Sequence, residues 1–136
     1  MPVLETDFLK ALIDPDDRLH DRAVKALKRV EEGEWFIVSS AFLELDLLLK
    51  KAGVSVEERV DVFESLKPHV RSEVVCKLSH QTMAVAGRLQ KAYSFSNFYF
   101  DSLHLGAAME HDGQIVSSDK SFDYVKEVKR IQLEKL

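Results

Sequence analysis

Acidic side chains occur at four places where an apolar run ends or a helix is expected to begin. The four segments are Val-Leu-Glu-Thr-Asp at 3–7, Ser-Ala-Phe-Leu-Glu-Leu at 40–45, Tyr-Phe-Asp-Ser-Leu-His at 99–104 and Ile-Val-Ser-Ser-Asp-Lys-Ser-Phe-Asp at 115–123. A carboxylate beside buried apolar residues costs desolvation free energy unless a cation compensates its charge. Neighbouring carboxylates also raise one another's pKa. If the fold brings the four segments together, a divalent metal ion is the simplest source of the compensating charge.

The composition of the chain favours one soluble globular domain spanning residues 1–136. Of its 136 residues, 46% are hydrophobic and 31% are charged, which is ordinary for a soluble protein of this size. The single cysteine, Cys76, excludes an internal disulfide and a cysteine-rich zinc site, so we expect a cytoplasmic protein. We expect no signal peptide and no membrane-spanning segment. The net charge of −4 argues against binding nucleic acid through bulk charge alone.

Short apolar runs alternate with amphipathic stretches along the whole chain. We predict strands at 2–5, 35–38, 74–76, 114–117 and 130–133. We predict helices at about 8–13, from Asp14 to Gly33, from Ser39 or Ser40 to Lys51, at 55–67, 79–93, 99–111 and 120–127, with a loop at 94–99. The helix from Asp14 is expected because Asp14-Pro15-Asp16-Asp17 combines a capping carboxylate with a proline in the first turn.

Strands separated by helices need crossover connections, so the sequence predicts an α/β fold with three layers, α/β/α, around a central, mainly parallel sheet. In such sheets the functional crevice lies at the carboxyl ends of the strands. Glu5 and Asp7 follow the first strand, and Asp119 follows the strand at 114–117. Glu44 and Asp101 are expected near the first turns of two helices. We therefore expect the acids to meet at one edge of the sheet.

These residues, in this order and spacing, resemble the PIN domain family of metal-dependent ribonucleases, which includes toxins of the VapC type. The family begins with an apolar strand that runs into an aspartate-threonine pair, matched here by Glu5-Thr6. Its later acids are a glutamate in the helix after the second strand, an aspartate opening an alanine-rich helix, and an aspartate in a Thr/Ser-x-Asp-x-x-Phe pattern. Glu44, Asp101 and Asp119 match these three acids. The resemblance covers nearly the whole chain, and its C-terminal pair of acids is the most specific part.

The resemblance implies an endonuclease that cleaves RNA with one or two Mg²⁺ or Mn²⁺ ions. A water molecule activated by such an ion would attack the scissile phosphorus. The implied catalytic residues are Asp7, Glu44, Asp101 and Asp119, and the implied metal ligands are these four residues and Glu5. Thr6 and Ser117 would hydrogen-bond the metal ligands, and Lys50, Lys51 and Lys120 are candidates for phosphate contact. The implied partners are an RNA substrate, a small antitoxin protein and a second copy of the chain in a homodimer.

The first acid departs from the family pattern, because Glu5 stands where the family has an aspartate. Asp7 lies two positions further on, so either residue is a candidate for the first ligand. If neither reaches the metal, the alternative function is a catalytically impaired PIN-like scaffold that binds RNA or protein. A small phosphatase is a third alternative, but the five glycines are too dispersed to form a phosphate-binding loop. His104 is interpreted as structural rather than catalytic, and Asp123 as a solvated surface residue.

Overall fold

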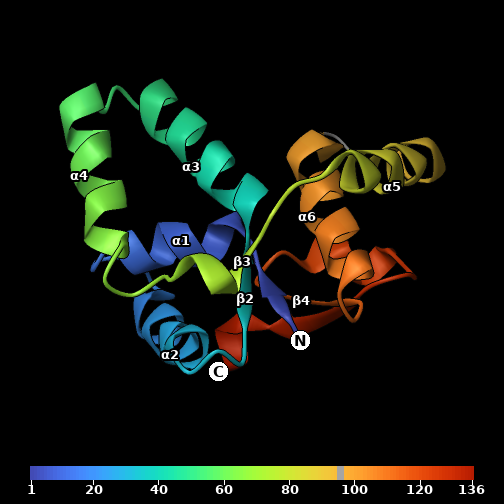
Figure 1. The fold of residues 1–136 in the computed structure, drawn as a ribbon, viewed down its shortest axis with the longest axis horizontal. Helices are drawn as coiled ribbons and strands as arrows, with labels where there is room; N and C mark the ends of the chain where they lie inside the picture. Colours follow the sequence, from blue (N-terminus) through green and yellow to red (C-terminus); the bar gives the residue numbers. More distant parts are fainter. Residues whose placement is uncertain (95–96) are drawn as a thin grey trace.

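The computed structural model describes residues 1–94 and 97–136 of the chain. Its centre is a five-stranded sheet with the order β3-β2-β1-β4-β5, and every neighbouring pair is parallel (Figure 1). The strands are β1 (Val3–Leu4), β2 (Phe36–Val38), β3 (Val75–Cys76), β4 (Gln114–Ser117) and β5 (Lys129–Gln132). The predicted α/β fold with a parallel central sheet is confirmed.

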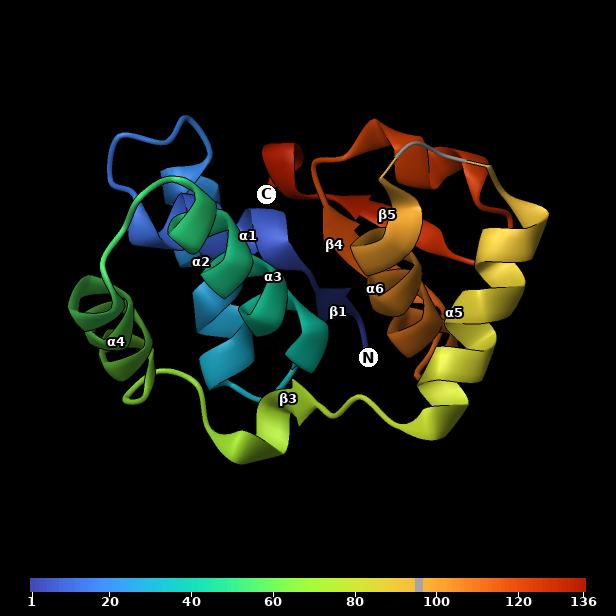
Figure 2. The ribbon, with the colours of Figure 1, turned by 90° about the horizontal axis from the view of Figure 1, so that it is seen from above.

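Six α-helices cover the sheet. They are α1 (Thr6–Ile13), α2 (His20–Glu31), α3 (Ser39–Lys51), α4 (Val56–Leu66), α5 (His80–Ala92) and α6 (Phe98–Glu110). Three short 3₁₀ turns complete the chain: η1 (Ser72–Val74), η2 (Lys120–Tyr124) and η3 (Leu133–Lys135). Figures 1 and 2 show α1 to α4 on one side of the sheet, and α5 and α6 on the other. No helix among the described residues is long and apolar enough to cross a membrane.

The register of the three central strands aligns their carboxyl ends. Leu4 is paired with Ile37 on one side and with Val116 on the other. All three residues are fully buried, as expected for strands covered by helices on both faces. The next residues along each strand therefore reach the same edge of the sheet, where α1 and α3 begin and β4 ends.

The predicted helix start at Asp14 is wrong, because α2 begins only at His20. The side chain of Asp14 accepts a hydrogen bond from the backbone N–H of Asp16, and that of Asp17 accepts one from Leu19. An aspartate that bonds the backbone two residues on stabilises a turn and competes with the helix. Residues 14–19 therefore form a turn segment between α1 and α2.

Serines stand at the predicted starts of three helices, and they cap two of these helices. Ser55 accepts a hydrogen bond from the backbone of Glu58 at the start of α4, and Ser79 forms a capping box with Thr82 at the start of α5. The start of α3 has no side-chain cap: Ser39 instead accepts a bond from the backbone N–H of Leu78. Ser40 bonds a buried side chain of α6, which is described below.

The remaining element boundaries differ slightly from the predictions. Residues 95 and 96 of the loop predicted at 94–99 lie outside the described residues, and α6 already begins at Phe98. Asn97 precedes it in the left-handed conformation, with φ of 56°. The helix predicted at 120–127 is only the 3₁₀ turn η2.

The helices α5 and α6 pack closely because Gly106 has no side chain. A Cβ atom at this position would lie 3.3 Å from the carbonyl oxygen of Thr82 and 3.4 Å from the backbone nitrogen of Ala86. Both contacts are with backbone atoms, which do not move aside as a flexible side chain would. This packing sets how far α6 lies from its neighbours, and α6 carries Asp101 and His104.

Candidate metal centre at the carboxyl edge of the sheet

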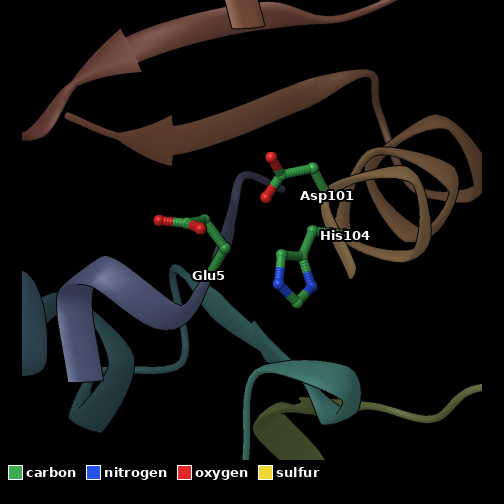
Figure 3. A group of neighbouring side chains, drawn as sticks. All are labelled: Glu5, Asp101 and His104. Atoms are coloured by element: carbon green, nitrogen blue, oxygen red, sulfur yellow. The ribbon is translucent and has the colours of Figure 1, made fainter. Parts of the chain in front are cut away.

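Side chains from distant parts of the chain converge at the carboxyl edge of the sheet. One potential ligand atom from each of Glu5, Asp101 and His104 lies within 4.8 Å of the others (Figure 3). In Figure 3, Asp101 and His104 project from α6 toward Glu5, which connects β1 to α1. Hydrogen bonds connect the other three acids to this group: Glu44 contacts His104, and Ser117 bonds Glu5, Asp7 and the backbone of Asp119. The structure thus brings together the five acids singled out in the sequence.

Glu5 forms the buried floor of this cluster. Its side chain caps α1 by accepting a 3.0 Å hydrogen bond from the backbone N–H of Asp7, and Ser117 Oγ donates to the same oxygen at 3.3 Å. Burial raises the pKa of Glu5 well above its ordinary value, and the negative charges of Asp7 and Asp101 raise it further. A buried carboxylate whose pKa is raised by neighbouring carboxylates favours a bound proton or a bound metal ion.

Asp7 is held by the loop that follows β4. Its Oδ2 accepts hydrogen bonds from the backbone N–H of Ser118 at 2.6 Å and from the Ser118 hydroxyl at 2.5 Å. Ser117 Oγ also donates to Oδ2, at 3.3 Å. The other oxygen, Oδ1, is buried without a hydrogen-bond partner among the described residues. A buried acceptor without a partner costs free energy.

Glu44 is positioned by Thr6 and His104. Its Oε1 accepts a 2.5 Å hydrogen bond from the Thr6 hydroxyl and lies 2.9 Å from His104 Nε2. Burial raises the pKa of Glu44, but the bonds from His104 and Thr6 outweigh that effect and hold it below its ordinary value. Glu44 is therefore a carboxylate kept ionised and oriented by residues of α1 and α6.

His104 was interpreted from the sequence only as structural, and its connections to the acids were not predicted. The ring is fully buried, and both nitrogens have partners: Nδ1 lies 2.8 Å from Ser40 Oγ, and Nε2 contacts Glu44 and Thr6. With Nε2 donating to Glu44, Nδ1 accepts from the Ser40 hydroxyl. Because both nitrogens are engaged, His104 orients Glu44 rather than binding a metal. Its position one turn after Asp101 was the only signal in the sequence.

Asp101 and Asp119 complete the cluster from the side of β4. Burial raises the pKa of Asp101 to about 7, and the charges of Asp119, Glu44 and Asp7 contribute. Asp119 is exposed; its Oδ1 caps η2 by accepting a 2.9 Å bond from the backbone of Ser121. Its own backbone N–H donates to Ser117 Oγ at 3.0 Å. Ser117 thus links the backbone of Asp119 to Glu5 and Asp7.

The residues fit a hard divalent cation. Within residues 1–94 and 97–136, no lysine or arginine forms an ion pair with any of the five carboxylates. The pKa values of Glu5 and Asp101 are raised, and Asp7 Oδ1 lacks a partner, so the cluster carries uncompensated negative charge. A set of carboxylate oxygens suits Mg²⁺ or Mn²⁺ rather than zinc.

The predicted phosphate-contacting lysines lie at different places around the site. Lys51 lines a cavity that Glu44 also lines, whereas Lys50 is exposed in the last turn of α3. Lys120 is exposed at the start of η2, next to Asp119, and its charge contributes to lowering the pKa of Asp123. Asp123 itself forms an ion pair with Arg130, so it is engaged outside the acidic cluster.

An acidic cluster at the carboxyl edge of a five-stranded parallel sheet defines an α/β protein with a site suited to divalent metal. The PIN domain family model matches residues 3–128, and the chain therefore belongs to the PIN domain family. A comparison with curated protein sequences finds no match.

Solved structures share the fold. FitAcB from Neisseria gonorrhoeae is 15% identical over 100% of both chains, with a TM-score of 0.75. VapBC2 from Rickettsia felis, solved bound to a DNA fragment from its promoter, is 17% identical over 95% of this chain and 96% of that chain, with a TM-score of 0.68. FitAB bound to an IR36 DNA fragment is 14% identical over 100% of this chain and 97% of that chain, with a TM-score of 0.72.

Proposed function

We propose that this protein is a ribonuclease that cleaves RNA phosphodiester bonds with Mg²⁺ or Mn²⁺. The metal ligands would be drawn from Glu5, Asp7, Glu44, Asp101 and Asp119. The observation that carries the proposal is Asp7 Oδ1, a buried carboxylate oxygen without a hydrogen-bond partner among the described residues, in a cluster where the pKa values of Glu5 and Asp101 are raised. Membership of a family of nucleases supports the same reaction.

The metal would activate water and stabilise charge on the phosphate. The residues of the chain would prepare the site for this chemistry. Ser118 holds Oδ2 of Asp7, which leaves Oδ1 for the cation. His104 and Thr6 hold Glu44 in one orientation and keep it ionised. Ser117 fixes Glu5 and the backbone of Asp119 together, so the ligands from β1 and β4 keep their relative positions.

The test is cleavage of a labelled single-stranded RNA with Mn²⁺, with Mg²⁺ and with excess chelator. We expect cleavage only with metal. Asp101→Asn should lower the cleavage rate about 100-fold or more, because removal of a metal ligand lowers activity at least as much as removal of a residue that supports a ligand. Asp123→Asn is the matched control, since Asp123 pairs with Arg130 instead. Unchanged cleavage by Asp101→Asn would end the proposal.

We further propose that the protein is the toxin of a toxin–antitoxin pair, forms a homodimer and acts on RNA in the cytoplasm. VapBC2 was solved with promoter DNA, and a chain of net charge −4 needs a basic partner to bind DNA in that way. A small DNA-binding protein encoded next to this chain should form a stable complex with it and suppress RNA cleavage. Cleavage that persists in that complex contradicts the toxin assignment.

One observation favours a second candidate, a PIN domain that binds RNA or protein without cleaving. Glu5, one methylene longer than the family's aspartate, is almost fully buried, and its pKa is raised well above its ordinary value. A carboxyl group that keeps its proton is a poor metal ligand. Isothermal titration with Mn²⁺ separates the candidates: binding in the millimolar range or tighter supports the nuclease, and no binding supports the scaffold.

A further inference from the structure

A cavity of about 370 Å³ lies beside the acidic cluster and shares Glu44 with it. The residues that line it include Glu44, Leu47, Leu48, Lys51, Tyr99 and Phe100. They come from one face of α3 and from the first turn of α6, the two helices that carry Glu44 and Asp101. A molecule bound at the acids and extending past Glu44 would enter this cavity.

The cavity is lined by aromatic and aliphatic surface that is open to solvent. Tyr99 is 55% exposed, and Leu47 and Leu48 are 38% and 37% exposed. The Tyr99 and Phe100 rings meet edge to face, with centroids 5.6 Å apart. Large apolar side chains gathered at one exposed place mark a binding site more often than chance exposure does.

The aromatic wall is also connected to the acidic cluster. The Phe100 ring stacks on the His104 ring, with a centroid distance of 6.4 Å and an interplanar angle of 30°. His104 in turn bonds Glu44. The position of Phe100 relative to the acids is therefore fixed through its contact with the buried ring of His104, and Tyr99 contacts Phe100.

A second cavity, of about 430 Å³, shares Asp7 with the acidic cluster and differs in chemistry. Besides Asp7 and Leu19, its lining includes two cations, a hydroxyl group and a second carboxylate, which belong to Lys10, Arg18, Ser118 and Asp17. Cationic and hydroxyl groups suit phosphate oxygens, whereas aromatic rings suit nucleobases. One strand of nucleic acid crossing the acids would meet phosphate-binding groups beyond Asp7 and stacking groups beyond Glu44.

We propose that the cavity lined by Tyr99, Phe100 and Leu47 binds one unpaired nucleobase of the RNA substrate, next to the phosphate that lies at the acids. The inference rests on the proposed ribonuclease function and adds a substrate requirement to it. A base in a duplex is already stacked and paired, so it cannot enter the cavity without being extruded. Cleavage is therefore restricted to positions with an unpaired base beside the scissile bond.

The test is binding of single-stranded RNA that carries one 2-aminopurine, placed at each position in turn, to the protein in Ca²⁺. We expect fluorescence quenching at one position, because the base stacks on an aromatic ring. Tyr99→Ala should abolish that quenching and weaken RNA binding about 5- to 150-fold. Tyr99→Phe should retain both, because the ring remains. Tyr124→Ala is the matched control, an exposed tyrosine that lines neither cavity.

Quenching and affinity unchanged in Tyr99→Ala would overturn the inference. It is also overturned if Tyr99→Ala leaves RNA binding intact but dissociates a dimer in sedimentation, because the cavity is then a contact between copies of the chain. Quenching that depends on Tyr99, in a protein that never cleaves RNA with Mn²⁺, supports the base-binding cavity and removes only the nuclease proposal. The two proposals therefore fail separately.

Discussion

Each carboxylate of the acidic cluster has its own supporting contacts, and these differ in kind. Asp7 is held by Ser118, Glu5 by the start of α1 and by Ser117, and Glu44 by Thr6 and His104. Residues that support metal ligands fix which oxygen faces the ion. The buried histidine is the least expected of these supports, because a polar ring in the core is stable only when both nitrogens are bonded.

Removing the His104 ring should weaken metal binding through Glu44. We expect His104→Leu to lower Mn²⁺ affinity about 10- to 100-fold, because Glu44 Oε1 loses a fixed partner. His104→Gln, which can still donate a hydrogen bond, should recover part of the loss. Isothermal titration at a temperature where all variants are folded measures the effect. His111→Gln is the control, because His111 is exposed and follows the last residue of α6. If His104→Leu binds Mn²⁺ as tightly as the natural protein, the ring serves packing alone.

At the scale of elements, the site depends on how closely helices approach one another. Glu44 and Ser40 lie on α3, Asp101 and His104 on α6, and the bonds from His104 join these helices over the end of the sheet. The position of α6 depends in turn on α5, which packs against it at Gly106. A change in that contact would move Glu44 and Asp101 relative to one another without altering either side chain.

Two glycines offer a matched test of this packing. Gly106→Val should lower the free energy of unfolding by about 1–3 kcal/mol, since its Cβ would approach backbone atoms of α5. Gly87→Ala, in the middle of α5 with open space around its Cβ position, should raise it by about 0.5–1 kcal/mol. Urea unfolding measures both. If both substitutions changed the free energy of unfolding equally and in the same direction, the valine side chain added at position 106 would meet no backbone of α5, and the contact between α5 and α6 would be loose.

At the scale of the whole molecule, the acidic cluster opposes folding unless a cation or protons neutralise it. Burial raises the pKa of Asp101 from an ordinary 3.8 to about 7, and the pKa of Glu5 is raised as well. Between pH 3.8 and about pH 7, Asp101 binds a proton more often in the folded protein than in the unfolded chain, so the free energy of unfolding falls as the pH rises. The contribution of protonated Asp101 to the free energy of unfolding is therefore complete below about pH 4 and lost above about pH 7.

The melting temperature of the metal-free protein should therefore fall between about pH 4 and about pH 7, and it should fall less in Asp101→Asn. Mn²⁺ competes with the protons, so its stabilising effect should grow over the same range. At a free concentration 100 times its Kd, Mn²⁺ should add about 2.7 kcal/mol. Thermal unfolding followed by circular dichroism provides the measurement. A pH profile that is identical in the two proteins would show that Asp101 is not the responsible group.

The sequence by itself predicted the parallel α/β architecture and the acids that lie at the carboxyl edge of its sheet. These features follow from short-range causes: apolar runs of strand length, glycines that end helices, and acids placed directly after strands. Where two local causes competed, as at Asp14 and Asp17, the prediction was wrong, because aspartates that favour helix caps also favour turns.

Only the tertiary structure decided which side chains support which acid. His104 reaches Ser40, Thr6 and Glu44 across 64, 98 and 60 residues of chain. The strand order, which places β1 between β2 and β4, was equally invisible in the sequence. Such contacts depend on sheet register and on helix packing distances such as the one at Gly106. Those distances result from the whole core packing at once, and no local pattern of residues encodes them.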